Sequence, residues 1–299
     1  MSIQRPLIEL LLRWQVKGKF KKNPDVQLLR PIMKQMEPHV SKLPSDIKAE
    51  PLHLGGVPAE KLTAEEPRQE AAFLYIHGGG WVAGSPLTHR PLTRRLAKDI
   101  GIPVYAIDYR LAPEHKYPAG LDDCVAAYKG LLDMGIAPSA ILVGGDSAGG
   151  NLTLALALRL KAEGLPMPAG LVCLSPATDM TGSGKSHTAN VKSDAMFVGE
   201  MIDTLEPAYC PGEDPKNPFL SPLFGDVSGF PPTFFQVGEK EILRDDSTRM
   251  ADALQKAGVE TTIEVWPKVW HVWQVNADML PEAREAIAHI VAFARRRLG

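Results

Sequence analysis

A serine within a short run of small residues is the feature of this sequence that best suits chemistry. Residues 145–150 read Gly-Asp-Ser-Ala-Gly-Gly and fit the pattern Gly-x-Ser-x-Gly. They lie between an apolar run at 141–143 and a helix-forming run at 151–163. That arrangement is typical of a tight strand-to-helix turn that exposes a serine hydroxyl, and bulky side chains would collide with the backbone there. The pattern predicts Ser147 as a nucleophile.

A second glycine cluster could supply the electrostatic part of such a site. Residues 77–80 read His-Gly-Gly-Gly and follow the apolar run 71–76. When a nucleophile attacks a carbonyl group, the carbonyl oxygen becomes an anion, which preorganised backbone N–H donors stabilise. We therefore expect an oxyanion hole formed by the N–H groups of Gly79, Gly80 and Ala148, beside the positive end of a helix dipole.

A serine hydroxyl is a poor nucleophile unless a base takes its proton and an acid orients that base. With this type of serine turn, the acid and then the histidine should follow the serine along the chain. Two histidines that follow the serine are candidates for the base, His271 and His289. His289 falls inside the predicted C-terminal helix, where a surface or packing role is expected. His271 follows the last predicted strand, so we predict it as the base.

The acid is expected in the loop after the predicted strand 232–237. Four carboxylic acids follow that strand: Glu239, Glu241, Asp245 and Asp246. Asp245 and Asp246 fit the start of the next helix, where carboxylates cap free N–H groups. Glu241 lies in the loop itself and is our preferred acid, with Asp245 as the main alternative.

The elements that must position these residues alternate along the chain. Predicted strands are 47–54, 71–76, 103–107, 141–145, 171–174, 232–237 and 261–265, and predicted helices are 88–99, 119–134, 151–163, 245–257 and 281–297. Strands that alternate with helices indicate an α/β fold with a mostly parallel sheet and helices on both faces. The length of 299 residues and a hydrophobic content of 44% fit one large domain with an accessory segment.

One region breaks this alternation. Residues 181–230 are rich in Gly, Ser and Pro, with a short helical signal at 199–207. A connection of that length is usually functional. We expect it to form a helical cap over the serine together with residues 1–45, which leaves residues 46–299 as the catalytic domain. Side chains expected to line a pocket under the cap are Trp81, Phe197 and Met201.

Composition excludes several classes of partner. The formal net charge of −2 argues against a nucleic-acid partner. The odd number and wide spacing of Cys124, Cys173 and Cys210 suit a reducing, cytoplasmic compartment and give no metal or disulfide framework.

The N-terminal segment 7–12 is apolar but short, and Glu9 interrupts it. It is therefore expected to form an amphipathic helix rather than a signal peptide or a stable membrane insertion. The lysines that follow are expected to form a solvated face, with attachment to a membrane surface as the alternative. They are Lys17, Lys19, Lys21 and Lys22.

Taken together, these motifs resemble the bacterial carboxylesterases of the hormone-sensitive-lipase-like family, within the α/β-hydrolases. The residues that carry the resemblance are His77-Gly78-Gly79-Gly80, residues 108–114 (Asp-Tyr-Arg-Leu-Ala-Pro-Glu), 145–150, 221–223 (Ser-Pro-Leu), 231–233 (Pro-Pro-Thr), 241–246 (Glu-Ile-Leu-Arg-Asp-Asp) and His271. They span roughly residues 70 to 275. One departure is that the family usually has aspartate where this chain has Glu241, which keeps Asp245 open as the acid.

The resemblance implies an eight-stranded, mostly parallel sheet, a cap, and hydrolysis of short- to medium-chain acyl esters through an acyl-enzyme, without a cofactor or metal. The implied partner is a small acyl ester, and an exposed edge strand or the N-terminal helix could pair two subunits. Alternatives are an amidase, a true lipase, or a non-catalytic receptor such as the plant gibberellin receptor, which resembles this family. Residues 111–114, Asp122 and Asp123 are expected to stabilise loops, and His77 to hold its loop rather than move protons.

Overall fold

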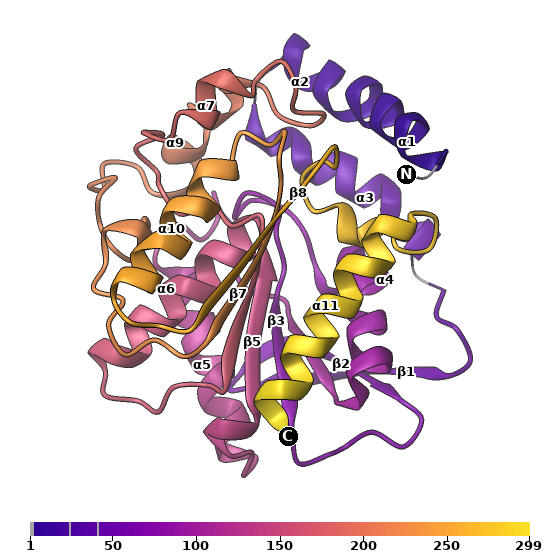
Figure 1. Cartoon of the computed structure of the whole chain (residues 1–299), viewed down its shortest axis with the longest axis vertical. Coiled ribbons are helices and arrows are strands. Elements are labelled where there is room, and N and C mark those ends of the chain that lie inside the picture. The colour runs from indigo at the N-terminus through magenta and orange to yellow at the C-terminus, as the bar shows by residue number, and fades with distance from the viewer. Residues whose placement is uncertain (1–2, 24, 41) are drawn as a thin grey trace.

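The computed structural model describes residues 3–23, 25–40 and 42–299. A β-sheet lies at its centre (Figure 1). Within these residues eight strands form one sheet in the order β1-β2-β4-β3-β5-β6-β7-β8. Their bounds are β1 (Ile47–Leu54), β2 (Val57–Ala64), β3 (Ala72–Ile76), β4 (Val104–Ile107), β5 (Ile141–Asp146), β6 (Gly170–Leu174), β7 (Thr233–Gly238) and β8 (Thr261–Trp266). Strands β3 to β8 pair in parallel, whereas β1 and β2 are antiparallel to their neighbours. The predicted fold class is therefore confirmed.

The central strands are the ones that the sequence predicts most clearly. Every residue of β3, β4, β5, β6 and β7 is buried, because helices cover both faces of the sheet. The sequence analysis missed β2 as a separate strand. Its polar residues Glu60 and Lys61 interrupt the apolar pattern, and its place in the sheet depends on the two-residue turn that joins it to β1.

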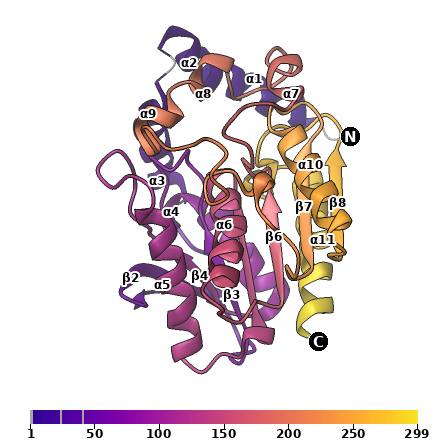
Figure 2. The same cartoon turned by 90° about the vertical axis from the view of Figure 1, so that its left-hand side faces the viewer.

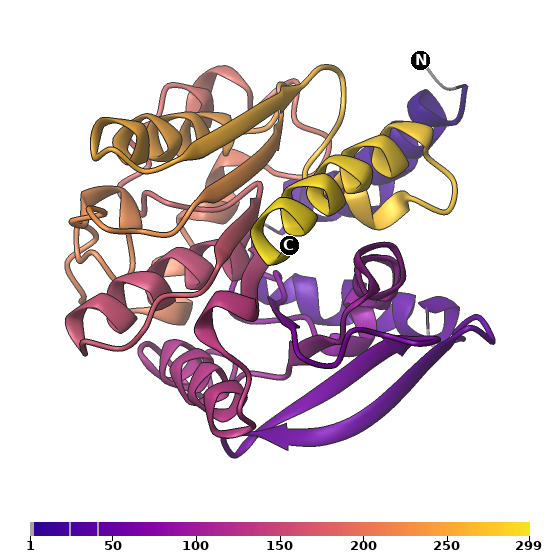
Figure 3. The ribbon, with the colours of Figure 1, turned by 60° about the horizontal axis from the view of Figure 1, so that its bottom comes forward.

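Two clusters of buried hydrophobic side chains lie on opposite faces of the sheet. Figure 3 shows the helices on either side of the sheet. One cluster includes side chains from α5 (Ala119–Asp133), α6 (Ala148–Ala162) and α10 (Arg244–Lys256). The other includes side chains from α4 (Pro86–Leu96) and α11 (Pro281–Leu298). The sheet is thus a buried middle layer, and the loops at its ends are left to carry chemistry.

The N-terminal helices and the irregular insertion lie together at one end of the molecule (Figures 1 and 2). They comprise α1 (Gln4–Leu12), a π-helical turn (Arg13–Lys17), α2 (Gly18–Lys22), a 3₁₀ turn (Val26–Leu28), α3 (Leu29–Val40), α7 (Ser186–Ala189), α8 (Gly199–Ile202) and α9 (Leu205–Tyr209). That they form a separate cap with boundaries at 45, 181 and 230 stays a prediction.

The short helical signal at 199–207 corresponds to two short helices in the structure. The helix α8 ends at Ile202, and α9 begins at Leu205. Pro207 lies in the first turn of α9, where its missing N–H group costs nothing, whereas it would break the interior of a longer helix.

The turn between β1 and β2 gives a test of how the hairpin is fixed on α5. Gly55 and Gly56 both have positive φ, +59° and +86°. A Cβ atom on Gly55 would lie 1.9 Å from the carbonyl oxygen of Ala126 in α5, whereas one on Gly56 would meet nothing within 4 Å. Gly55→Ala should lower the free energy of unfolding by about 3 kcal/mol, and Gly56→Ala by about 1 kcal/mol. Urea unfolding of both variants measures the difference, and equal losses would contradict the packing described.

Candidate active site

Ser147 lies in a strained turn between β5 and α6. Its φ of 53° and ψ of −118° are rare for a residue with a side chain, and strain of this kind is common at functional sites. A Cβ atom on Gly149 would lie 2.0 Å from the carbonyl oxygen of Ile76, and one on Gly145 would lie 2.3 Å from the same atom. The turn therefore admits only glycine at these two positions, as the pattern indicates.

His271 and Glu241 are joined by a buried hydrogen bond. The distance from His271 Nδ1 to Glu241 Oε2 is 2.7 Å, and the glutamate side chain is fully buried. The other carboxylate oxygen, Oε1, accepts hydrogen bonds from the Ser175 hydroxyl at 2.8 Å and from the Gly238 N–H group at 2.6 Å. Three donors therefore hold the carboxylate. Because Nδ1 of His271 is bonded to Glu241, Nε2 is the ring nitrogen available for proton exchange.

The order of the strands explains why these residues meet. Strands β5, β6, β7 and β8 are parallel neighbours, so their carboxyl ends share one edge of the sheet. Ser147 follows β5, Ser175 follows β6, Glu241 follows β7, and His271 follows β8. Ligands and catalytic residues of open α/β sheets gather at this edge.

The Ser147 hydroxyl is not hydrogen-bonded to His271 in the described part of the chain. Asp146, which precedes Ser147, acts electrostatically on the His271 ring through its carboxylate. Hydrogen bonds between catalytic groups are often long in enzymes without substrate. The transfer of a proton from Ser147 to His271 therefore stays a prediction.

The electrostatic surroundings of His271 favour its protonated form. Burial of the ring opposes the charge, but the carboxylate of Glu241 and the hydrogen bond to it outweigh burial and raise the pKa of His271. Asp194 and Asp146 act in the same direction. A histidine in such a setting is stabilised as an imidazolium, the species that forms when it takes a proton from a nucleophile.

The other predicted acids lie elsewhere. Asp245 accepts hydrogen bonds from the Ser186 N–H group at 3.0 Å and from the guanidinium of Arg244. Glu239 is exposed on the surface. His289, the alternative base, pairs with Glu264 at the surface.

Asp246 has a structural partner of its own. Its carboxylate binds His187 Nε2 at 2.6 Å and accepts the N–H group of Thr178 at 2.8 Å. The contact ties α7 of the insertion to the start of α10. Asp246 is therefore engaged away from His271.

The glycine segment after β3 lies against the serine turn. The carboxylate of Asp146 accepts hydrogen bonds from the Gly78 N–H group at 3.1 Å and from the Tyr75 hydroxyl at 2.6 Å. Within the described residues, the N–H groups of Gly79 and Gly80 donate no hydrogen bond. Since Ala148 begins α6, its N–H group has no partner within the helix. All three predicted oxyanion donors are thus available.

His77 holds this segment as a neutral ring. Its Nδ1 lies 2.8 Å from the Gly78 carbonyl oxygen, and the ring stacks on Tyr109 with centroids 4.4 Å apart. Burial and the nearby His89 lower the pKa of His77 to about 3. A ring that stays neutral is suited to holding a loop, as expected from the sequence.

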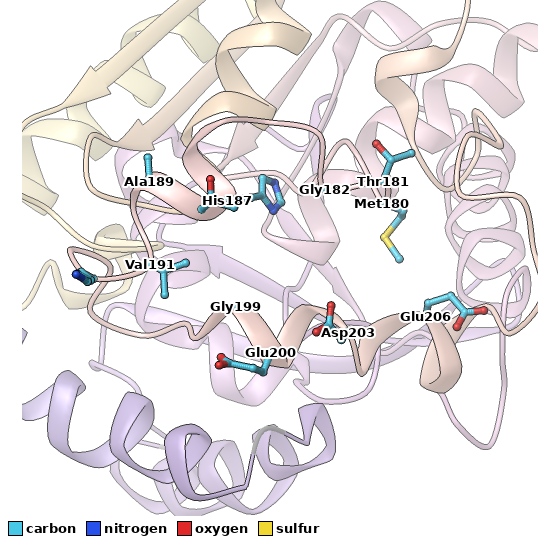
Figure 4. Close-up of a pocket in the computed structure, with 12 residues that line it drawn as sticks. Met180, Thr181, Gly182, His187, Ala189, Val191, Gly199, Glu200, Asp203 and Glu206 are labelled. Carbon is cyan, nitrogen blue, oxygen red and sulfur yellow. The ribbon is translucent and has the colours of Figure 1, made fainter.

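A cavity of about 950 Å³ opens between the loop 180–192 and the helices α8 and α9 (Figure 4). Residues that line it include His187, Val191, Glu200, Asp203 and Glu206. Neither Ser147 nor His271 is among the lining residues. The cavity therefore does not reach the two catalytic candidates.

One of the predicted pocket residues, Phe197, contacts the catalytic candidate His271. Its ring packs edge-on against His271, with centroids 4.6 Å apart. Trp81 is buried and stacks on Tyr209 of α9 at 4.7 Å. The side chain of Met201 lies outside the described residues.

The sequence analysis missed two residues that shape this site. Ser175 holds Glu241, and Asp146 joins the glycine segment to the serine turn. The position of Ser175 directly after a buried strand that neighbours β5 was the available signal. The pattern Gly-x-Ser-x-Gly allows any residue at position 146, so no sequence signal indicated a role for Asp146.

Comparisons with known proteins agree with this geometry. A family described as "alpha/beta hydrolase fold" matches residues 73–275. An acetyl-hydrolase of Streptomyces hygroscopicus is 40% identical over 76% of this chain and 76% of its own length. An esterase of Acinetobacter venetianus is 38% identical over 96% of this chain and 94% of its own length.

Solved structures give the same result. The crystal structure of an esterase from the bacterial hormone-sensitive lipase family is 40% identical, with a TM-score of 0.94, and covers 100% of this chain and 99% of its own. This chain belongs to the α/β-hydrolase fold family, among the members that resemble hormone-sensitive lipase. The predicted family and the predicted class of enzyme, a hydrolase, are confirmed.

The hydrogen bond from Ser175 to Glu241 can be tested separately. Ser175→Ala removes one donor but leaves the carboxylate its bonds to Gly238 and His271. We expect kcat/KM for a short ester to fall about tenfold through kcat, with KM unchanged, because one buried hydrogen bond is worth about 1.5 kcal/mol.

Ser228→Ala, in an exposed loop, is the matched control and should leave the kinetics unchanged. A folded Ser175→Ala variant with the parental kcat would contradict the positioning role.

Proposed function

We propose that this chain is a serine carboxylesterase that hydrolyses short- to medium-chain acyl esters through an acyl-enzyme intermediate. The observation that carries the proposal is the buried hydrogen bond between His271 and Glu241, at the edge of the sheet where the Ser147 turn lies. Relatives of the chain are named acetyl-hydrolase and esterase, which supports an ester substrate.

In the first step, Ser147 Oγ attacks the carbonyl carbon of the ester while His271 Nε2 takes the hydroxyl proton. A new C–O bond forms, and the electron pair of the C=O bond moves to the oxygen. The N–H groups of Gly79, Gly80 and Ala148 stabilise that oxyanion, with help from the N-terminus of α6.

The intermediate then collapses. His271 donates its proton to the leaving alcohol, the ester C–O bond breaks, and the acyl group stays on Ser147. Water enters and loses a proton to His271 while its oxygen attacks the acyl carbon, and a second oxyanion forms. When this intermediate collapses, the bond between the acyl carbon and Ser147 Oγ breaks, His271 returns the proton to Oγ, and the acid leaves. Throughout, Glu241 remains charged, keeps the proton on Nδ1, and stabilises the imidazolium.

Ser147→Ala tests the nucleophile. It should reduce hydrolysis of a short p-nitrophenyl ester by at least a thousandfold, because no acyl-enzyme can form. Measurement of the parent on acyl chains of two to sixteen carbons gives the chain-length preference, with the highest rates expected on short chains. Full activity of the Ser147→Ala protein would end the proposal, and the highest rates on emulsified long chains would indicate a lipase.

The pH profile tests the base and the acid together. His271 acts only while neutral, and its pKa is raised, so kcat/KM should fall as the pH decreases through a value above 6.5. Glu241→Gln removes the negative charge that favours the imidazolium. It should therefore move this fall to lower pH and reduce kcat by about 10⁴-fold.

Asp245→Asn is the matched control and should change neither quantity. A flat profile between pH 5 and 8 would argue against a histidine base. If Asp245→Asn shifted the profile and Glu241→Gln did not, Asp245 would be the acid.

A further inference from the structure

The N-terminal helix carries apolar side chains on both of its faces. Ile8, Leu12, Val16 and Phe20 recur every four residues and pack inward, with Val16 and Phe20 buried in the core. A second set points outward, with exposed fractions of 92% for Ile3, 61% for Leu7, 64% for Leu10, 45% for Leu11 and 75% for Trp14. A helix that is apolar all round is normally buried all round. Here only the inner face is covered.

The exposed side chains form a continuous stripe. Their positions follow the spacing i, i+4, i+7, i+8 and i+11, which places them on one face of a helix. The other large apolar side chains exposed in the described structure lie on four separate elements or loops: Met134, Phe224, Val265 and Met279. A concentrated apolar stripe marks an interaction surface, whereas scattered apolar residues do not.

The basic residues of this helix serve two different purposes. Those on the inner side fasten it to the rest of the chain: Arg5 binds the Lys268 carbonyl at 3.0 Å, and Arg13 binds the Ser193 carbonyl at 2.6 Å. Lys17 is buried and binds the Asp194 carbonyl at 2.6 Å. The expectation that Lys17 is solvated is therefore wrong, because backbone carbonyls of the insertion replace water around its ammonium group.

The lysines that remain exposed follow the stripe directly. Lys19, Lys21 and Lys22 lie in α2, at the end of the same helical segment. Residues 18–22 contain these three exposed lysines and no acidic residue, in a chain whose formal net charge is −2. Positive charge is therefore concentrated beside the apolar stripe.

We propose that this surface, made of Ile3, Leu7, Leu10, Leu11, Trp14 and the three exposed lysines, docks the protein on an anionic lipid bilayer. The apolar stripe enters the boundary between headgroups and acyl chains, where tryptophan is favoured, and the lysines bind anionic headgroups. No helix in the described part of the chain is long and apolar enough to cross a membrane. The helix accordingly lies in the plane of the membrane surface.

The charges favour a lipid over a second copy of the chain. A second copy of this helix offers the lysines no free carboxylate, because the one acid of residues 3–22, Glu9, is paired with Arg13 at 2.9 Å. Anionic headgroups neutralise them instead, and about 1 kcal/mol per lysine is expected near such a surface.

Vesicle binding by the full chain tests the proposal, with Ser147→Ala as the background so that hydrolysis cannot intervene. Binding to vesicles of phosphatidylglycerol and phosphatidylcholine should be roughly a hundredfold tighter than to phosphatidylcholine alone. Leu10→Ser with Trp14→Ser should weaken it at least tenfold. Met134→Ser with Met279→Ser removes equally exposed apolar groups elsewhere and should change it less than twofold.

Two further variants separate the two parts of the surface. Replacement of Lys19, Lys21 and Lys22 by Gln should remove the preference for anionic vesicles. Trp14→Phe should remove most of the blue shift of tryptophan fluorescence on vesicle addition, because Trp81, Trp270 and Trp273 are already buried and the half-buried Trp266 lies in β8, outside the stripe.

Equal binding by the stripe variant, or no binding to anionic vesicles by the parent, would overturn the proposal. A parent that is dimeric in sedimentation, binds no vesicles, and becomes monomeric on Leu10→Ser with Trp14→Ser would assign the stripe to a second copy of the chain.

Discussion

The arrangement of this site depends on the hydrogen bond between the carboxylate of Glu241 and the ring of His271. Burying a lone charge is costly, and Glu241 is fully buried. Hydrogen bonds from Ser175, Gly238 and His271 offset that cost, and they come from the ends of three adjacent strands. Each donor is in place because parallel strands end at one edge of the sheet. A change in strand order or register would leave the charge without partners.

Gly238 also explains how the turn accommodates glutamate at position 241, whose side chain is one methylene longer than that of aspartate. A Cβ atom on Gly238 would lie 2.8 Å from Glu241 Oε1, so the turn leaves room for the longer side chain only because residue 238 is glycine. Asp146, at the end of β5, is a second buried carboxylate that accepts hydrogen bonds. It is buried, and although burial opposes its charge, the nearby His89 and the hydrogen bonds from His89 and Tyr75 lower its pKa to about 2. Two buried carboxylates thus join loops that are far apart in the sequence.

The parts of this structure that the sequence predicts are those that local patterns determine. Fully buried strands read as apolar runs, and the serine turn requires small residues at fixed spacing. The polar strand β2 was missed because Glu60 and Lys61 interrupt its apolar pattern, so that only its pairing with β1 and β4 identifies it as a strand. The sequence favours Glu241 as the acid but leaves Asp245 open as the alternative. Both carboxylates lie within six residues, and only the direction of each side chain separates them.

The glycine segment also touches the N-terminal helices and the insertion. A Cβ atom on Gly80 would lie 3.1 Å from Val26, 3.3 Å from Leu29 and 3.4 Å from Leu205. These three side chains belong to elements outside the sheet. In the described structure those elements make few contacts with the strands. Warming should therefore loosen this covering first and shift the backbone of Gly80 while the strands remain paired. Heat inactivation would then begin below the melting temperature of the sheet. The highest temperature at which the protein stays active is therefore set by the N-terminal helices and the insertion rather than by the sheet.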